Sequence, residues 1–589
     1  MSADSLIASA DTIRKPADTI RVFLTLLIVL EIRSVRGSIF SLGEWIVSRR
    51  IVLKVGKRSG FSCVFLRQYI SFCYFHFAIY GIVYTFGPSN ISQTNSKKRN
   101  TMAEEKTPGL SAAFSPKKLW EFVGIILVTT IVWNLPIDFF GINGLTVVQQ
   151  RIIAIFVFAT LSWLTECIPS WATSLGIITT MCLTVTNNAL LPFKGEGVGE
   201  LLKSKEVMAS FADPVIMLFL GGFILAIAAS KSGLDVLLAR SMIKPFGRKS
   251  ENVLLGFLLI TGVFSMFVSN TATAAMMLTF LTPVFAALPA SGKGRIALTL
   301  SIPVAANLGG MGTPIGTPPN MIALKYLNSP EGLNMDIGFG TWMMFMLPLV
   351  ILLLVISWRV LLYFFPFTKK TIDLHITGEV HRGWRMWVVC ATFIITILLW
   401  VIPKEITGID SNTVAMVPMG VFAVTGVITA KDLQEINWSV IWMVAGGFAL
   451  GLGMNGSGLA ENAIDSIPFG SWSPVAILLI SGLICYFLSN FISNTATAAL
   501  LVPILAVVCK GMGGALGTIG GTATILIGIA IAASSAMCLP ISTPPNAIAY
   551  STGLVKQNEM LKVGLTMGIV SMVLGYLVLY FVGSMHLMA

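Results

Sequence analysis

Charged residues are scarce in this chain. Asp, Glu, Lys and Arg together make up 11% of the 589 residues, whereas hydrophobic residues make up 55%. An ordinary soluble domain carries about a quarter charged residues, so this composition excludes that class. Apolar runs of about twenty residues recur along the chain, and each is long enough to cross a bilayer as a helix. The sequence therefore predicts an all-α polytopic membrane protein.

The motifs of several other functional classes are missing. The eight cysteines have no paired spacing, so neither a disulfide framework nor a zinc site is indicated. The apolar segments contain no His-Glu-x-x-His and no paired catalytic Asp, which argues against an enzyme. A ring of like charges and a short filter loop are also missing, which disfavours an ion channel.

The net charge of +12 belongs mostly to the amino-terminal segment. Residues 1–101 hold 14 Lys and Arg against 5 Asp and Glu, and the remaining residues hold 25 against 22. This segment shares no pattern with the rest of the chain, and Met102 begins a stretch that resembles a start of translation. We expect translation to begin there, with a cleaved targeting peptide or an extra amphipathic helix as the alternatives. The membrane domain is predicted at 115–589, and a nucleic-acid partner is not expected.

Three motifs occur twice in the chain and in the same order. They are Gly-Gly-Phe at 221–223 and 446–448, Ser-Asn-Thr-Ala-Thr-Ala-Ala at 269–275 and 493–499, and Thr-Pro-Pro-Asn at 317–320 and 543–546. The two copies are 225, 224 and 226 residues apart, so a whole block has been duplicated. A duplicated membrane unit with polar, helix-breaking motifs at matching positions is typical of a secondary transporter with inverted repeats.

The apolar runs place these motifs at helix breaks. The runs at 252–288 and 473–509 are too long for one crossing and carry Ser-Asn-Thr near the middle, which predicts two re-entrant hairpins. Prolines and glycines interrupt the runs around 309–319 and 540–545, which predicts two broken helices. Together with the remaining runs, this predicts about 11 transmembrane helices, with repeat 1 at about 115–364 and repeat 2 at about 384–589. The basic loops place the amino end on the cytoplasmic side.

The Ser-Asn-Thr triplets suit an anion. Each precedes a good helix former, and the first turn of a capped helix offers free backbone N–H groups and a positive dipole end. Two such sites facing each other would match a substrate that carries two carboxylates. The alternative is that the polar residues only cap the helices.

The unwound Thr-Pro-Pro-Asn segments suit a cation. Backbone carbonyls without helical partners are oxygen ligands for Na⁺, and Ser265 and Ser489 each stand four residues before a Ser-Asn-Thr motif. The hairpin cores and the two helix breaks contain no Lys or Arg, so a dianion bound there needs bound cations. By linkage, the anion then raises the cation affinity equally. The alternative is that the prolines are simple kinks.

At these residues the chain resembles the divalent anion/sodium symporter family of di- and tricarboxylate carriers. The paired Ser-Asn-Thr motifs, the two Thr-Pro-Pro-Asn loops and Thr-Glu-Cys-Ile-Pro at 165–169 carry the resemblance, which covers about residues 115–589. It implies substrate contacts at Ser269, Asn270, Thr271, Ser493, Asn494, Thr495, Thr317 and Thr543. It implies one Na⁺ near Ser265, Ser269, Asn270 and Gly316, and a second near Ser489, Ile492, Asn494 and Ser542.

The resemblance also implies a homodimer in which a hairpin-bearing domain moves like an elevator against a fixed scaffold. The predicted function is Na⁺-coupled symport of C4-dicarboxylates such as succinate, malate and fumarate, by a multi-pass protein of the cell membrane. The alternatives are a Na⁺-independent dicarboxylate exchanger, a citrate or sulfate carrier of the same family, and an anion channel.

Overall fold

The computed structural model describes residues 116–286, 288–289, 292–330, 332–372 and 383–585. Within these ranges the regular structure is helical, and no β-strand occurs. Residues 1–101, for which the sequence predicts a late start or a targeting segment, lie outside the described residues.

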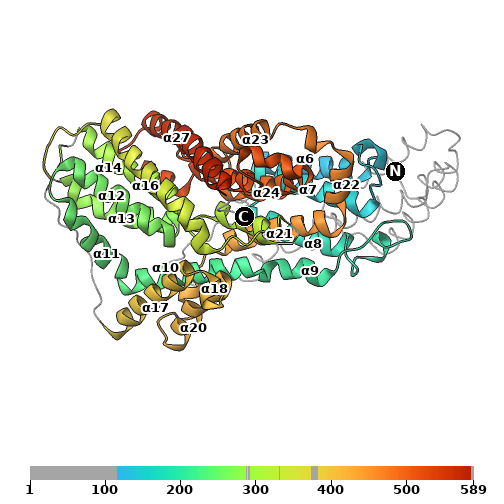
Figure 1. The fold of residues 1–589 in the computed structure, drawn as a ribbon, viewed down its shortest axis with the longest axis horizontal. Coiled ribbons are helices and arrows are strands. Elements are labelled where there is room, and N and C mark those ends of the chain that lie inside the picture. The colour runs from blue at the N-terminus through green and yellow to red at the C-terminus, as the bar shows by residue number, and fades with distance from the viewer. Residues whose placement is uncertain (1–115, 287, 290–291, 331, 373–382, 586–589) are drawn as a thin grey trace, which may run out of the picture. The chain divides into compact units, whose positions relative to one another are not determined.

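The first helices precede the duplicated hairpin motif. They are α6 (Pro116–Asn134), α7 (Val147–Thr165), α8 (Ser170–Thr184), the short α9 (Ser204–Ala209), α10 (Pro214–Ser232) and α11 (Leu234–Ile243) (Figure 1). α7 begins with a capping box, in which the Thr146 and Gln149 side chains each accept a bond from the other's backbone N–H. α10 begins with Asp213 as its N-cap and ends at Gly233, whose φ of 70° lies in the left-handed region that favours glycine.

The first set of motif-bearing helices contains two breaks. It comprises α12 (Ser250–Phe267), α13 (Asn270–Ala286), α14 (Lys293–Gly310), α15 (Pro318–Asn328) and α16 (Phe339–Phe364) (Figure 1). The chain leaves the helix between α12 and α13 at Val268 and Ser269, and again between α14 and α15. α15 restarts at Pro318, a first-turn position where the missing N–H of proline breaks no helical bond.

A middle group connects the two sets. It comprises α17 (Trp384–Val401), the short α18 (Lys404–Thr407) and α19 (Ser411–Val414), then α20 (Met416–Val424), α21 (Trp438–Gly456) and α22 (Leu459–Ser466). α21 carries the second Gly-Gly-Phe motif, as α10 carries the first.

The second set repeats the order of the first. It comprises α23 (Pro474–Ser489), α24 (Asn494–Met512), α25 (Ala523–Ser535), α26 (Pro544–Ser551) and α27 (Gln557–Ser584) (Figure 1). The break between α23 and α24 contains Ser493, and α26 restarts at Pro544, as α15 restarts at Pro318. The helix breaks therefore recur at the positions where the motifs recur.

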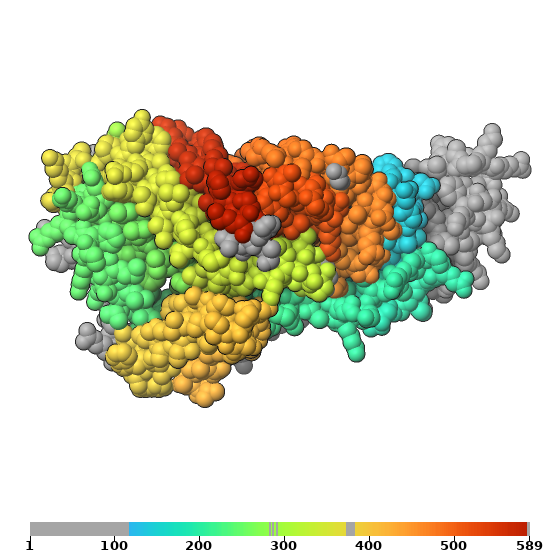
Figure 2. Space-filling model, in the orientation of Figure 1, coloured from blue at the N-terminus to red at the C-terminus, as the bar shows by residue number. Residues whose placement is uncertain are grey.

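Eight helical stretches of the described chain are long and apolar enough to cross a membrane, by length and composition. Three shorter apolar helical stretches accompany them, at 411–424, 474–489 and 523–535. The count of about 11 crossings and the re-entrant course of the hairpins remain predictions. Large apolar side chains are exposed on α16, α17 and α27, including Ile351, Ile394 and Val573, as lipid-facing helices require. α16 and α27 pack together, and Figure 2 shows them side by side on one face.

The duplicated glycine pairs lie where helices approach closely. A Cβ on Gly221 would lie 2.5 Å from Ala415 O, and a Cβ on Gly446 would lie 2.4 Å from the Ser174 side chain. The second glycine of each pair faces a motif-bearing segment: a Cβ on Gly222 would lie 3.2 Å from Ile315, and a Cβ on Gly447 would lie 3.2 Å from Ala499. α10 and α21 thus pack against the segments that carry the candidate site.

Candidate functional site at the helix breaks

The first Ser-Asn-Thr motif forms the start of α13. Ser269 Oγ accepts a hydrogen bond from Ala272 N at 3.3 Å, which is the contact of an N-cap residue. Ser269 and Asn270 are half-buried and Thr271 is exposed. The hydroxyl of a serine that accepts at a cap still has its own proton to donate, so capping does not prevent Ser269 from binding an anion.

The second motif forms the start of α24 in the same way. Ser493 Oγ accepts from Ala496 N at 3.1 Å. Ser493 and Asn494 are again half-buried, but Thr495 is buried. The two breaks therefore have the same local structure and differ in how far their threonines are covered.

The Asn270 side chain lies among three oxygens. One of its terminal amide atoms lies 2.6 Å from Ser265 Oγ, 3.1 Å from Gly316 O and 3.2 Å from Ala306 O. Carbonyls can only accept, so the amide nitrogen occupies this position when the contacts are hydrogen bonds. Ser265 Oγ donates to Ala306 O at 2.7 Å. The structure thus brings together Ser265, Asn270 and Gly316, three of the four residues that the family resemblance implies for the first Na⁺.

The corresponding atoms of the second half lack hydrogen bonds. Ser489 Oγ and Asn494 Oδ1 are both buried, and neither has a nitrogen or oxygen hydrogen-bond partner within the described part of the chain. A buried polar oxygen without a partner costs free energy, and a bound cation would remove that cost. Ile492, a third residue assigned to the second Na⁺, is buried and follows directly in the break.

The asparagines of the two Thr-Pro-Pro-Asn motifs support the unwound segments. Asn320 Nδ2 donates to Gly310 O at 3.0 Å and to Thr313 O at 2.8 Å. Asn546 Nδ2 donates to Met537 O at 2.8 Å and to Leu539 O at 2.9 Å. At these carbonyls, a side-chain amide takes the place of the helical N–H that the break removes.

Ser542 forms a hydrogen bond with Asn490, a residue that the sequence motifs did not indicate. Its Oγ donates to Asn490 O at 2.9 Å, and Asn490 Oδ1 accepts from Cys538 N at 2.8 Å. Asn490 therefore connects the end of α23 to the unwound segment before α26. An amide residue next to Ser489, in an otherwise apolar run, is the signal that could have identified it.

The two predicted site threonines differ in their contacts. Thr317 makes no side-chain capping bond at the start of α15, whereas Thr543 Oγ1 accepts from Asn546 N at 3.3 Å. Both are buried, with 4% of each residue exposed. Repeat-related positions therefore do not have identical surroundings.

Two glycines allow the segments at the first break to pack closely against each other. A Cβ on Gly310 would lie 2.7 Å from the Asn270 side chain, and a Cβ on Gly316 would lie 2.4 Å from Gly310 O. Such separations are far below a normal contact, so only glycine permits the Asn270 side chain and the unwound segment to approach α14 this closely.

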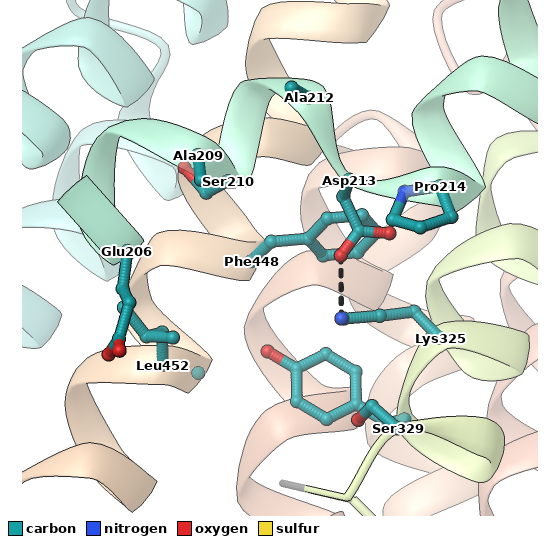
Figure 3. Close-up of a pocket in the computed structure, with 12 residues that line it drawn as sticks. Glu206, Ala209, Ser210, Ala212, Asp213, Pro214, Lys325, Ser329, Phe448 and Leu452 are labelled. Carbon is teal, nitrogen blue, oxygen red and sulfur yellow. Dashed lines mark ion pairs between the residues drawn. The ribbon is translucent and has the colours of Figure 1, made fainter.

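A cavity of about 280 Å³ lies apart from the Ser-Asn-Thr and Thr-Pro-Pro-Asn motifs, between the end of α9, the start of α10, α15 and α21 (Figure 3). Lys325 and Asp213 form an ion pair across it at 2.6 Å, and Lys325 lies 5.6 Å from the centre of the Phe448 ring. The neighbouring Tyr326 donates its hydroxyl to Gly447 O at 3.2 Å. Neither Ser-Asn-Thr motif contributes to its lining, so the cavity marks a contact of α15 with α10 and α21.

Within the described residues, no group of three or more His, Cys, Asp or Glu side chains is arranged to hold a metal ion. The oxygens that converge at the breaks are hydroxyls, amides and carbonyls, all of them neutral. Neutral oxygens at unwound helices are the donors that transporters use for Na⁺.

Known proteins are similar to this chain over most of its length. A family model described as citrate transporter matches residues 156–520. The sodium-dependent dicarboxylate transporter of Staphylococcus saprophyticus is 31% identical over 500 residues, covering 78% of this chain and 91% of that protein. The protein of the same name from Staphylococcus aureus is 30% identical over 508 residues, covering 79% and 92%.

Two further proteins are similar. An uncharacterized transporter of Haemophilus influenzae is 33% identical over 443 residues, covering 72% of this chain and 89% of that protein. Among solved structures, the YdaH transporter of Alcanivorax borkumensis has a TM-score of 0.49 and 14% sequence identity, covering 70% of this chain and 98% of that one.

Proposed function

Because this chain belongs to the citrate transporter family of divalent anion/sodium symporters, we propose that it is a secondary transporter that couples Na⁺ to the movement of C4-dicarboxylates. The observation that carries the proposal is the presence of buried oxygens next to both Ser-Asn-Thr motifs. Three oxygens surround the Asn270 amide, and at the second motif the oxygens of Ser489 and Asn494 are buried without a nitrogen or oxygen partner among the described residues.

In the proposed anion site, the substrate binds at the starts of α13 and α24, where the two Ser-Asn-Thr motifs lie. Ser269 and Ser493 hold the starts of α13 and α24, whose first-turn N–H groups can bind a carboxylate. Thr271, Thr495, Thr317 and Thr543 would add hydroxyl donors. Two equivalent motifs match a substrate with two carboxylates better than a single tetrahedral oxyanion such as sulfate.

In the proposed first Na⁺ site, the cation lies among the oxygens around the Asn270 amide. Asn270 therefore belongs to both the Na⁺ site and the anion site. Without a cation, the Asn270 nitrogen donates to Gly316 O and Ala306 O. With a cation among these oxygens, the amide oxygen can occupy the same position as a ligand, and the nitrogen then points the other way. Because an amide nitrogen binds carboxylates and an amide oxygen does not, Na⁺ binding would prepare Asn270 for the substrate. The two affinities are then coupled reciprocally.

Alternating access is supported by the contacts of the duplicated glycines. Gly222 and Gly447 are related by the repeat, yet Gly222 faces Ile315 and Gly447 faces Ala499, which are not related. Ile541 is the repeat counterpart of Ile315, and Ala275 is the counterpart of Ala499. Both counterparts are exposed. If the repeats exchange conformations, Gly222 would contact Ala275 and Gly447 would contact Ile541. We propose this exchange as the elevator movement, with α10 and α21 on the scaffold side.

The contacts around the Lys325 cavity belong to the same proposal. The Lys325–Asp213 ion pair and the Tyr326–Gly447 hydrogen bond hold α15 against α10 and α21 in the present arrangement. These contacts would have to break in the exchanged arrangement. They would therefore stabilise one end state of the cycle.

The test is uptake of labelled succinate into proteoliposomes of the purified protein, with an inward Na⁺ gradient or with choline in its place. We expect saturable uptake that requires Na⁺. Uptake that ignores Na⁺ but is accelerated by internal malate would instead indicate an exchanger, and uptake of only citrate or sulfate would indicate a different substrate class. Single-channel currents in a bilayer would contradict the transporter proposal.

A further inference from the structure

Asn307, in the first half of the chain, reaches the Thr-Pro-Pro-Asn motif of the second half. Its Nδ2 lies 3.2 Å from Thr543 Oγ1 and 3.4 Å from Asn546 Oδ1. Asn307 lies on α14 and is 1% exposed, so these are contacts within the protein interior, where α14 packs against α26.

The orientation of the Asn307 amide follows from its neighbours. Asn546 Nδ2 donates to the carbonyls of Met537 and Leu539, which can only accept, and this fixes the Asn546 oxygen on the opposite side. That oxygen faces Asn307 and requires a donor. Asn307 therefore presents its nitrogen, and the same nitrogen reaches Thr543 Oγ1.

The consequence for Thr543 is that its hydroxyl becomes a donor. A threonine hydroxyl has two lone pairs and one proton. At Thr543, one lone pair accepts from Asn546 N at 3.3 Å and the other accepts from Asn307 Nδ2. Both lone pairs are in use, so only the proton remains for a further partner, and within the described chain Thr543 donates to none.

We infer that Asn307 is a positioning residue, which holds the Thr543 hydroxyl ready to donate to one carboxylate of the substrate. The inference rests on the proposed function, since it needs an anion at this site. Asn307 itself does not touch the substrate. It acts through Thr543, and it would favour a ligand that accepts hydrogen bonds over one that donates them.

The first half of the chain lacks this arrangement. The offset of 226 residues that relates Thr317 to Thr543 places Ala533 at the position of Asn307, and alanine has no donor. Correspondingly, Asn320 Oδ1 is buried without a hydrogen-bond partner within the described residues, although Asn320 is the counterpart of Asn546. The hydroxyl of Thr317 is therefore not oriented in this way. The two carboxylate sites would be unequal, with the Thr543 side preset as a donor.

The experiment is a pair of double-mutant cycles measured by Na⁺-driven succinate uptake, with Asn307→Leu combined with Thr543→Val or with Thr317→Val. We expect Asn307→Leu to raise the KM for succinate about tenfold with little change in maximal rate, and Thr543→Val to do the same. The double variant Asn307→Leu/Thr543→Val should be no worse than either single change, because both remove the same donor. The effects of Asn307→Leu and Thr317→Val should multiply.

Asn307→Asp separates donation from packing when uptake is measured at a pH where its carboxylate is ionised, because it keeps the size of the side chain but then offers only acceptors. The Thr543 proton would then be drawn to Asp at 307, and the KM should rise more than with leucine. Stabilisation by succinate in a thermal unfolding assay gives the same comparison for any variant that no longer transports.

Two outcomes would overturn the inference. If the wild type transports succinate but the Asn307–Thr543 cycle is additive, or Asn307→Asp behaves like the wild type, Asn307 only fills space. If the wild type shows no Na⁺-dependent dicarboxylate uptake, the proposed function fails, and this inference fails with it.

Discussion

At the scale of single residues, the two proposed Na⁺ sites differ in which side-chain oxygens have hydrogen-bond partners. The hydroxyl of Ser265 is hydrogen-bonded, whereas the oxygens of its repeat counterpart Ser489 and of Asn494 are buried with no nitrogen or oxygen partner among the residues that the structure describes. Two sites built on the same Ser-Asn-Thr motif thus differ in their hydrogen bonding. Because of this difference, substitutions at equivalent positions of the two sites should have different effects on stability.

Replacing Asn270 or Asn494 by Ala should almost abolish uptake while leaving the protein folded in the membrane. Each change removes an amide that is proposed to serve both ion and substrate, and each lost charged hydrogen bond contributes about 1.5–3 kcal/mol, or about 10- to 100-fold. Initial uptake rates, normalised to the amount of protein in the proteoliposomes, measure this. Asn455→Ala is the control, since among the described residues this half-buried amide bonds only Gly451 O of its own helix. Near-normal uptake by Asn270→Ala would mean that the motif only caps α13.

Ser489→Ala and Ser265→Ala should differ in the absence of Na⁺. Ser265→Ala removes a buried hydrogen bond and should lower the unfolding midpoint in choline, whereas Ser489→Ala removes an unsatisfied oxygen and should not. Both should weaken the stabilisation that added Na⁺ produces. Thermal unfolding in detergent, in choline and in Na⁺, measures both effects. If Ser489→Ala destabilises the protein in choline as much as Ser265→Ala does, Ser489 has a partner other than Na⁺.

At the scale of helices, close backbone approach holds the breaks in place. α12 and α14 meet at Gly262 and Gly309, and a Cβ on Gly309 would lie 2.3 Å from Gly262 O. Helix breaks expose backbone groups, so the surrounding helices must be near enough for side chains such as Asn320 to replace the missing bonds.

Gly309→Ala should therefore destabilise the protein, by about 1–3 kcal/mol, because it forces two helix backbones apart. Gly420→Ala is the matched control. Gly420 is also helical, but a Cβ there would meet nothing within 4 Å, so alanine should be neutral or stabilising by up to about 1 kcal/mol. Unfolding midpoints of the two variants in detergent measure the difference, and equal midpoints would contradict the close contact.

An ion pair connects the end of α10 to the loop before α21. Lys231 Nζ lies 2.6 Å from Asp432 Oδ2, and Thr429 donates to the same carboxylate. Burial raises the pKa of Asp432, but the hydrogen bonds from Lys231 and Thr429 outweigh it and lower the pKa from 3.8 to about 2. Because the folded pKa is the lower one, this stabilisation is present above pH 3.8 and is lost as the pH falls toward 2.

Lys231→Met should therefore lower the unfolding midpoint at neutral pH, and the difference from the wild type should shrink as the pH falls below about 4. Unfolding midpoints of both proteins across this range measure the effect. A difference that stays constant down to pH 2 would show that Lys231 acts by packing rather than by charge.

At the scale of the whole molecule, the duplicated sequence occurs in an unequal arrangement. Gly222 and Gly447 make non-equivalent contacts, and the surfaces that would make the exchanged contacts are exposed. The proposed exchange predicts a second arrangement, in which Gly222 and Gly447 make the contacts that the other now makes.

Cysteine pairs can trap the two arrangements in a variant whose native cysteines are replaced. Gly447→Cys with Ala499→Cys should cross-link in the present arrangement, since the positions are as close as a disulfide requires. Gly447→Cys with Ile541→Cys should cross-link only in the exchanged one. Each cross-link should stop uptake, and reduction should restore it. If only the first pair forms in transporting membranes, the exchange does not occur at this contact.

The sequence by itself determined the helical membrane class, the duplication, the positions of the four helix breaks and the residues that form them. These depend on local hydrophobicity and on prolines, glycines and capping residues, whose effects act within a few positions along the chain. Only the tertiary structure decided that Asn490 supports Ser542 and that Asn307 reaches Thr543. It also decided that, within the described chain, Ser265 bonds a carbonyl oxygen whereas Ser489 meets no nitrogen or oxygen partner. These contacts join segments that are far apart in the chain, and they depend on how the repeats pack. Asn307 and Thr543, for example, are separated by 236 positions. The same motif therefore acquires two different surroundings.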